Sequence, residues 1–250
     1  MKFLGIIPAR YASTRFPGKP LADIGGKPMI QRVYEQAQTA VDELVVATDD
    51  ERIANVVHHF GGRVVLTSTE QHSGTDRCYE AFLKTGIFFD VVINIQGDEP
   101  FIQPKQIERL KSCFSEADTQ IATLVKPFDK NDDTEQLVNV NTPKVVINNR
   151  NEAMYFSRSI IPFMRGVANP EWIEKHTFYK HIGLYAYRSD ILKEITALPQ
   201  SSLELAENLE QLRWLQNGYK IKVAITNQET IGIDTPEDLK KAMELFLEFS

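Results

Sequence analysis

The sequence contains short, almost wholly apolar runs that alternate with segments of helical periodicity. The runs at 3–7, 43–48 and 90–95 lack the every-second-residue polarity of a strand with one wet face. Helical spacing follows the first two runs, at 29–40 and 50–60. Apolar strands that alternate with helices are typical of a parallel sheet covered on both faces. The sequence therefore predicts an α/β fold.

The pattern changes after about residue 125. Two strand-like runs at 144–147 and 153–156 flank a polar turn, which predicts a hairpin. We expect one domain over 1–250 that carries a smaller, mostly antiparallel insertion at about 130–190. A helix at 203–217, a strand at 221–225 and a helix that begins at Pro236, with Thr235 as its N-cap, complete the chain.

Composition and charge narrow the class of protein. The chain has 250 residues, 42% of them hydrophobic, and a net charge of −6, which argues against nucleic-acid binding. The apolar start is too short for a signal peptide, and no run approaches the length that spans a bilayer. The two cysteines lack metal-ligand spacing. We expect a cytoplasmic protein without membrane insertion.

The first loop, at 8–20, concentrates positive charge directly after a buried strand. It matches neither G-x-G-x-x-G nor G-x-x-x-x-G-K, so the two commonest nucleotide-binding motifs are absent. Its hydroxyls and its cations Arg10, Arg15 and Lys19 could still wrap a triphosphate, with Gly18 permitting a tight turn. The alternative is a surface loop with scattered cations. Its position after the first strand favours phosphate binding.

Two further loops converge on the same sheet edge. Thr48 and Asp49 follow the second strand, and residues 96–98 follow the fourth. Because open parallel sheets bind ligands at the carboxyl ends of their strands, cations, small residues and an acid should meet there. The sequence therefore predicts one anion-binding site at this edge.

Several ordered motifs carry a family resemblance. The run at 6–28, IIPARYASTRFPGKPLADIGGKP, resembles the opening of the CMP-Kdo synthetases, the 3-deoxy-manno-octulosonate cytidylyltransferases. The likeness continues, in order, in ATD (47–49), HSGTDR (72–77), NIQGDEP (94–100), YFSR (155–158), HIGLYAYR (181–188), LEQLR (209–213) and GIDTPEDL (232–239). It spans nearly the whole chain and is weakest at 126–143 and 163–178.

The resemblance implies a Rossmann-like sheet of the nucleotide-diphospho-sugar transferase type. It implies transfer of CMP from CTP to the anomeric hydroxyl of 3-deoxy-D-manno-octulosonate (Kdo), with release of pyrophosphate, for lipopolysaccharide biosynthesis. It also implies a homodimer, formed through the insertion. The expected catalytic residues are Arg10, Lys19, Asp98 and Asp234.

A further set is expected to bind CTP: Ala9, Arg10, Ser13, Thr14, Arg15, Lys19, Ala47, Thr48, Asp49, Ser73, Gly74, Arg77, Gln96 and Gly97. In the family the region of 72–77, together with two small residues, helps to read cytosine. The block also begins a predicted helix, so Ser73 or Thr75 could simply cap it. Arg77 could instead be a structural partner of Asp76 or Asp49.

The resemblance places the acidic sugar against Gln96, Arg158, His181, Tyr185, Glu207, Glu210 and Gln211. A sugar rich in hydroxyls needs such a mixture of donors and acceptors, and Arg158 could offset its carboxylate. Each residue has a plainer alternative: Glu207 and Glu210, three apart on one helix, could face solvent, and His181 could belong to the core.

Asp98 and Asp234 are the candidate ligands of Mg²⁺. A hard cation prefers oxygen, usually takes one or two protein carboxylates, and completes its shell with water and phosphate. The alternative is that Asp98 is a turn residue and Asp234 a loop acid before a helix cap. A metal pair argues against the rival of a non-catalytic nucleotide-binding regulator. A cytidylyltransferase for another acidic sugar, such as amino-Kdo or a sialic acid, stays open.

Overall fold

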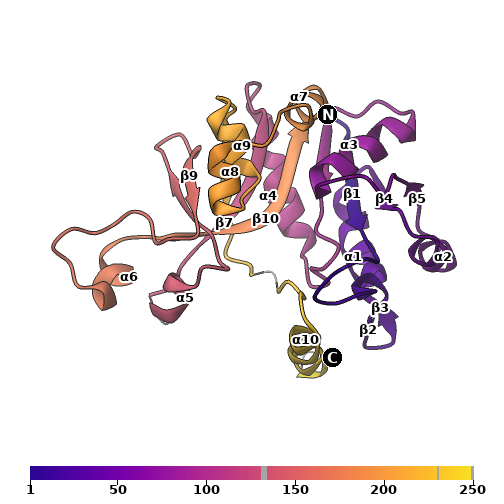
Figure 1. The fold of residues 1–250 in the computed structure, drawn as a ribbon, viewed down its shortest axis with the longest axis horizontal. Coiled ribbons are helices and arrows are strands. Elements are labelled where there is room, and N and C mark those ends of the chain that lie inside the picture. Colours follow the sequence, from indigo (N-terminus) through magenta and orange to yellow (C-terminus); the bar gives the residue numbers. More distant parts are fainter. Residues whose placement is uncertain (131–133, 230, 249–250) are drawn as a thin grey trace. The chain divides into compact units, whose positions relative to one another are not determined.

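The computed structural model describes residues 1–130, 134–229 and 231–248, and its chain divides into two compact units (Figure 1). Unit 1 comprises residues 1–108, 186–196 and 230–250, and unit 2 comprises 109–185 and 197–229. Unit 2 contains most of the insertion predicted at 130–190 and extends beyond it on both sides. The boundaries of that insertion therefore stay a prediction.

Unit 1 is built on a parallel sheet. Its strands lie in the order β6-β1-β4-β5, and they span Val91–Asn94, Phe3–Ala9, Glu43–Thr48 and Val64–Leu66. Ile6 pairs with Val45 on one side and with Asn94 on the other, both in parallel register. Nearly every residue of β1 and β4 is buried, as strands covered on both faces require. The predicted parallel sheet is confirmed.

Helices α1, α2 and α3 separate these strands along the chain, and the other helices of unit 1 follow them. These helices are α1 Met29–Ala37, α2 Glu51–His59, α3 Gly74–Thr85, α4 Pro104–Ser112, which continues into unit 2, α7 Ser189–Thr196 and α10 Pro236–Glu248. Short 3-10 turns lie at Lys19–Leu21 and Gln38–Ala40, and a small antiparallel pair joins β2 Asp23–Ile24 to β3 Lys27–Pro28.

Unit 2 contains the predicted hairpin and a second set of strands. Strands β8 Lys144–Ile147 and β9 Ala153–Ser157 are antiparallel, and β7 Ile121–Pro127 pairs in parallel with β11 Ile221–Ile225. Strand β10 Tyr179–Arg188 is antiparallel to β8 and ends within unit 1. The short helical segments of unit 2 include η3 Cys113–Ser115, α5 Thr134–Val138, η4 Asn169–Glu171 and α6 Trp172–Lys175.

The helix predicted at 203–217 is wrong as a single helix. The structure has α8 Ser202–Glu207 and α9 Gln211–Gln216, separated where Asn208 adopts a left-handed conformation with φ 51°. Asparagine tolerates this conformation better than most residues and often ends a helix in this way. Glu207 therefore closes one helix and Glu210 precedes the next.

A buried ion pair joins α8 to α9. Arg213 donates from Nε and Nη2 to the two carboxylate oxygens of Glu204, at 2.8 and 2.5 Å, and both side chains are about 8% exposed. Removing one partner of such a pair leaves a buried charge without compensation. The pair fixes the two helices that carry Glu207, Glu210 and Gln211.

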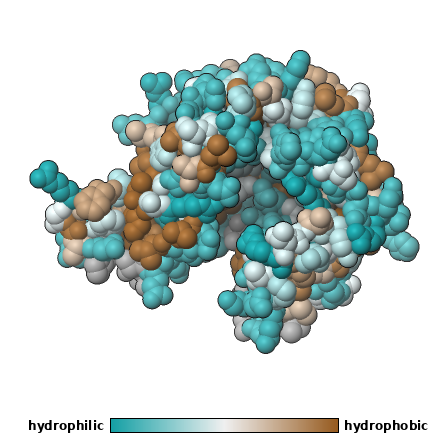
Figure 2. Space-filling model, viewed as in Figure 1, coloured by the Kyte–Doolittle hydropathy of each residue, from teal (hydrophilic) through white to brown (hydrophobic). Residues whose placement is uncertain are grey.

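The visible face is mainly hydrophilic, with apolar side chains gathered over the part of unit 2 near β9 (Figure 2). The large apolar residues that unit 2 exposes include Val138, Val140, Met154, Phe163 and Leu205. Among the described residues, none of the helices combines the length and apolar character needed to cross a bilayer.

We expect Arg213→Met to destabilise the protein by about 3–5 kcal/mol, because Glu204 would stay buried without its cation. Urea unfolding followed by circular dichroism measures the change. Lys175→Met is the matched control, since its pair with Glu171 is about half exposed and its loss should cost less than about 0.5 kcal/mol. Equal stabilities of the two variants would contradict the structural role of the buried pair.

Candidate active site

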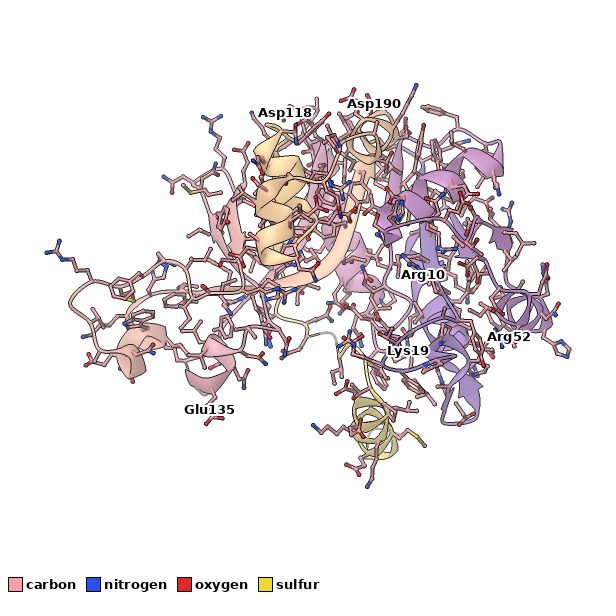
Figure 3. All side chains as sticks on the ribbon, in the orientation of Figure 1. Arg10, Lys19, Arg52, Asp118, Glu135 and Asp190 are labelled. Atoms are coloured by element: carbon pink, nitrogen blue, oxygen red, sulfur yellow. The ribbon has the colours of Figure 1, made fainter. Side chains whose placement is uncertain are left out.

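The loop after β1 is closed by its own hydrogen bonds. Gly18 donates its backbone N–H to the Tyr11 carbonyl at 2.9 Å and has φ 71°, a conformation that favours glycine. A Cβ there would meet the Tyr11 ring at 3.1 Å. Phe16 donates its backbone N–H to the Ser13 hydroxyl at 3.2 Å. The loop is therefore a folded turn that presents its cations, and Figure 3 labels two of them, Arg10 and Lys19.

This loop borders a cavity of about 560 Å³, within the usual size of ligand sites. Its lining consists of Pro8, Ala9, Arg10, Ala12, Ser13, Thr14, Arg15, Lys19, Pro20, Gln96, Gly97, Asp98 and Asp234, all from unit 1. The predicted convergence is thus present at the carboxyl ends of β1 and β6, whereas Thr48 and Asp49, which follow β4, do not line this cavity. Pro8, Ala12 and Pro20 were not predicted, and their only sequence signal was their place within the loop.

Lys19 lies between the two predicted metal ligands. Its Nζ is 2.7 Å from Asp98 Oδ2 and 3.1 Å from Asp234 Oδ1, while Arg15 Nη2 is 3.1 Å from Asp234 Oδ2. Lys19 is 14% exposed, whereas the two aspartates are 30% and 47% exposed. Both carboxylates can therefore reach one cation and solvent at the same time.

The position of Asp234 follows from backbone and capping contacts. Ile233 donates its N–H to the Asp98 carbonyl at 2.9 Å, and its side chain is buried with Ile24 and Met29. Thr235 caps α10, as predicted, because its hydroxyl accepts from the Asp238 N–H at 3.1 Å. Asp238 in turn accepts from the backbone of Asp234 at 3.2 Å.

Sequence reasoning missed Asp238, although a threonine three residues before an acid is a capping-box signal. Partial burial alone would raise the pKa of Asp238, but hydrogen bonds from Thr235 and Asp234 outweigh it and lower the pKa. Asp238 is therefore a charged support for the segment that carries Asp234.

The block predicted to read cytosine lies beside the first loop. Arg10 Nη2 is 3.4 Å from the His72 carbonyl. A Cβ on Gly74 would lie 3.7 Å from Pro8 and 3.6 Å from Asn94 Nδ2, which is ordinary contact. Ser73 caps α3 through a reciprocal bond with Asp76, so the capping alternative also holds. The two loops are thus adjacent, although Ser73 and Gly74 do not line the cavity.

Arg77 has a structural role within unit 1, and its predicted contact with CTP stays a prediction. Its side chain is fully buried, with Nη2 2.8 Å from Asp49 Oδ2 and Nη1 2.5 Å from the Thr67 hydroxyl. This is the partnership with Asp49 that the sequence left open. Ala47 and Thr48 are also fully buried. Ala47, Thr48 and Arg77 therefore support the loops from the interior of the protein.

The residues predicted to bind the sugar, apart from Gln96, lie in unit 2. Glu207 accepts from the Ser157 hydroxyl at 2.6 Å and from the Arg158 N–H at 2.9 Å. Arg158 donates from its guanidinium to the carbonyls of Val140, Glu207 and Asn208. These contacts tie three chain segments together and leave only part of the Arg158 guanidinium for a carboxylate.

The remaining members of that set surround an aromatic group. The His181 ring lies 5.1 Å from Phe156 and 5.2 Å from Tyr185, and Tyr185 lies 5.2 Å from Trp214. Burial raises the pKa of Tyr185 well above its usual range, so it is a neutral phenol. Gln211 is also buried, and Glu210 Oε1 is 3.7 Å from Arg213 Nη2.

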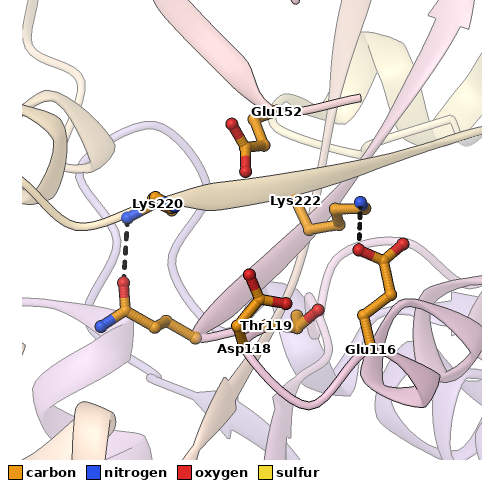
Figure 4. Close-up of a pocket in the computed structure, with 7 residues that line it drawn as sticks. Glu116, Asp118, Thr119, Glu152, Lys220 and Lys222 are labelled. Carbon is orange, nitrogen blue, oxygen red and sulfur yellow. Dashed lines mark hydrogen bonds and ion pairs between the residues drawn. The ribbon is translucent and has the colours of Figure 1, made fainter. Parts of the chain in front are cut away.

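A second hollow lies in unit 2 (Figure 4). Its volume is about 10 Å³, room for about one water molecule. Lys222 Nζ donates to Glu116 at 2.6 Å, and the Lys220 N–H donates to Gln120 at 3.1 Å. These two contacts join polar groups of the lining to one another, which favours a structural cluster over a ligand site.

The comparisons with known proteins bear on the whole chain. The family model described as Cytidylyltransferase matches residues 4–222. A 3-deoxy-manno-octulosonate cytidylyltransferase of Parabacteroides distasonis is 70% identical over 244 residues, 97% of each chain. That of Porphyromonas gingivalis is 57% identical over 96% of this chain and 94% of its own. The chain belongs to this family. The resemblance found in the sequence is confirmed.

Solved structures of related proteins have the same fold as this chain. A CMP:2-keto-3-deoxy-manno-octonic acid synthetase complexed with CTP is 42% identical, with a TM-score of 0.91 over the full length of both chains. A 4-diphosphocytidyl-2C-methyl-D-erythritol synthase of Anaerococcus prevotii has a TM-score of 0.60 over 98% of this chain and 99% of its own, and at 14% identity it shows the fold alone. The predicted nucleotidyltransferase fold is confirmed.

We expect Lys19→Ala to lower the rate of pyrophosphate release roughly 10²–10³-fold, by analogy with the loss of one preorganised charge donor. Turnover should fall more than affinity for the nucleotide, because the cation acts on charge that develops in the transition state. Steady-state kinetics measure both. Lys27→Ala is the control, since Lys27 pairs with Glu35 and does not line the cavity. Normal turnover of Lys19→Ala would indicate that the loop is a surface loop with no role in the reaction.

Proposed function

We propose that the protein transfers CMP from CTP to the anomeric hydroxyl of Kdo, and that the CMP-Kdo formed serves lipopolysaccharide biosynthesis. Family membership supports the reaction class. The observation that carries the proposal is the cavity at the carboxyl ends of β1 and β6, lined by three cations and two carboxylates. Such a lining suits a triphosphate and the charge that passes to its leaving group.

In this proposal the first loop binds and orients the triphosphate. Arg10, Arg15 and Lys19 neutralise its charge and stabilise the pyrophosphate as it departs. Ser13 and Thr14 supply hydroxyl donors from the same wall of the cavity. Because the loop that carries these groups is already folded, little backbone reorganisation is needed when the bond to the α-phosphorus breaks. Ala9, Gln96 and Gly97 complete the part of the cavity lining that contacts the nucleotide in this proposal.

Asp98 and Asp234 fit a magnesium ion. Both carboxylates already approach one cation, the Nζ of Lys19, within 3.1 Å. Among the described residues no group of three or more His, Cys, Asp or Glu side chains could hold a metal. Two carboxylates are the number that Mg²⁺ usually takes when substrate phosphate and water supply the other ligands. The bound ion would neutralise phosphate charge and lower the pKa of the attacking hydroxyl.

The sugar contacts remain proposals for Gln96, Arg158, His181, Tyr185, Glu207, Glu210 and Gln211. Their chemistry supports them, because the set mixes hydroxyl, amide, imidazole and carboxylate groups. We also propose a homodimer in the cytoplasm. The support for the dimer is the large apolar side chains that unit 2 exposes, such as Met154 at 62%.

We expect the protein to use CTP far better than ATP or GTP, because the predicted base pocket beside Gly74 is too small for a purine. A mismatched hydrogen bond in a buried site costs about 1–3 kcal/mol, so UTP should be used about ten- to a hundredfold less well than CTP. Pyrophosphate release from each nucleotide, with Kdo, amino-Kdo and sialic acid as acceptors, measures the choice. Equal rates with ATP and CTP would contradict the base pocket.

We expect Asp98→Asn and Asp234→Asn each to abolish most activity and to weaken Mn²⁺ binding in the presence of CTP, because each removes a charged oxygen ligand. The double variant should be little worse than either single one, since both residues serve one ion. Electron paramagnetic resonance of bound Mn²⁺ reports the metal directly. Asp23→Asn is the control, because Asp23 binds the Gly26 N–H in an exposed turn. Unchanged Mn²⁺ affinity in both variants would overturn the metal site.

A further inference from the structure

Thr123, which neither the sequence motifs nor the proposed site includes, lies at the centre of a polar cluster in unit 2. It sits on β7 and is fully buried. Its hydroxyl oxygen is 2.9 Å from the Leu184 carbonyl, 3.2 Å from the Ile182 carbonyl and 3.0 Å from His181 Nε2. All three partners belong to β10.

Four polar groups surround the Thr123 hydroxyl, because the Tyr185 hydroxyl also forms a hydrogen bond with it. A hydroxyl has one hydrogen to donate and two lone pairs, whereas a carbonyl can only accept. The two carbonyls and the Tyr185 hydroxyl can all accept the single Thr123 hydrogen. If that hydrogen pointed to His181 instead, both carbonyl oxygens would face the hydroxyl oxygen, at 2.9 and 3.2 Å, with no hydrogen between them. The arrangement therefore favours His181 Nε2 as a donor to a lone pair of Thr123.

The His181 ring is also neutral. Phe156 and Tyr185 flank it, and among the ion pairs of the described residues none involves His181. Desolvation by these surroundings lowers the pKa of His181 to about 3. A neutral imidazole that is protonated on Nε2 has an unprotonated Nδ1. That nitrogen can accept a hydrogen bond and cannot donate one.

We propose that Thr123 is a positioning residue that holds His181 in the Nε2–H tautomer, so that Nδ1 accepts a hydrogen bond from a hydroxyl of the sugar. The inference rests on the proposed function in that the ligand at His181 is the acidic sugar. A hydroxyl can donate to Nδ1, whereas a carboxylate would meet it lone pair to lone pair. As a whole residue, His181 is intermediate in exposure, and its Nε2 is the ring nitrogen that faces Thr123. The residue therefore selects for a hydroxyl and against the carboxylate.

The tautomer can be measured in the full-length wild-type protein. In ¹⁵N-histidine-labelled protein at neutral pH, we expect one ring whose Nε2 is protonated and whose Nδ1 resonates as an unprotonated nitrogen. Loss of that signal in His181→Gln assigns it. Addition of Kdo should move the Nδ1 resonance toward that of a hydrogen-bonded acceptor. An Nδ1–H tautomer, or a charged ring, would overturn the proposal, as would an Nδ1 resonance that saturating Kdo leaves unmoved.

Variants of Thr123 separate positioning from folding. Thr123→Val removes the hydroxyl and should raise the KM for Kdo about tenfold, the loss of roughly one oriented hydrogen bond, while the KM for CTP changes little. Its His181 spectrum should show a mixture of tautomers. Thr123→Ser keeps a hydroxyl and should restore both readouts.

The matched control is Thr119→Val. Thr119 is buried in the same unit and donates its hydroxyl to the Cys113 carbonyl at 2.7 Å, away from His181. It should lower the melting temperature, as Thr123→Val does, yet leave the His181 spectrum and the KM for Kdo unchanged. A wild-type tautomer in Thr123→Val, or an equal change of KM for Kdo in Thr119→Val, would refute the role of Thr123.

The proposed function and the proposed role of Thr123 can be refuted independently. If the wild type releases no pyrophosphate from CTP and Kdo, the proposed function is refuted, and so is the identity of the ligand at His181. The ¹⁵N spectrum of the unliganded protein would still decide whether Thr123 sets the tautomer. If the enzyme is active and His181 is the Nε2–H tautomer, but Kdo leaves the Nδ1 resonance unmoved, only the proposed contact between Nδ1 and the sugar is refuted.

Discussion

The candidate active site depends on the ion cluster of Lys19, Asp98 and Asp234. These residues come from three segments far apart in the sequence, and Lys19 Nζ lies within 3.1 Å of both carboxylates. The backbone bond from Ile233 to Asp98 and the burial of Ile233 hold two of the segments in place without help from charge. The scaffold therefore stays ordered when the charges are rearranged by a ligand.

Energetics indicate that this cluster serves ligand binding more than folding. The two aspartates are 30% and 47% exposed, and ion pairs this open contribute about 1 kcal/mol or less to stability. The cavity lining carries three cations against two carboxylates, so one net positive charge remains for a highly charged triphosphate. A metal held by the carboxylates would supply the missing positive charge and free Lys19 for phosphate, which is why the two predicted roles are compatible.

The sequence was sufficient for the sheet and the loops but not for side-chain partnerships. Apolar runs predicted β1, β4 and β6, and the order of the loops predicted that Arg15, Lys19 and Asp98 would meet, whereas Asp234 was expected there from the family resemblance. The sequence left Asp49 and Asp76 open as partners of Arg77 and could not decide between them, because Asp49 lies 28 residues away along the chain. The break at Asn208 was missed for a different reason: helical periodicity continues across it, and only the left-handed backbone separates α8 from α9.

The cavity of unit 1 and the polar clusters of unit 2 use polar groups in different ways. The cavity of unit 1 keeps its charges partly exposed, where water and a ligand can exchange with them, and long-range attraction suits an anionic nucleotide. Unit 2 contains buried polar groups that are satisfied internally, as in the pair of Glu204 with Arg213 and in the hydroxyl of Thr123. A buried donor or acceptor that lacks its partner costs far more than an exposed one, so groups fixed in this way discriminate by geometry. Charge therefore suits recognition of the phosphates, and fixed hydrogen-bond direction suits recognition of one sugar among similar ones.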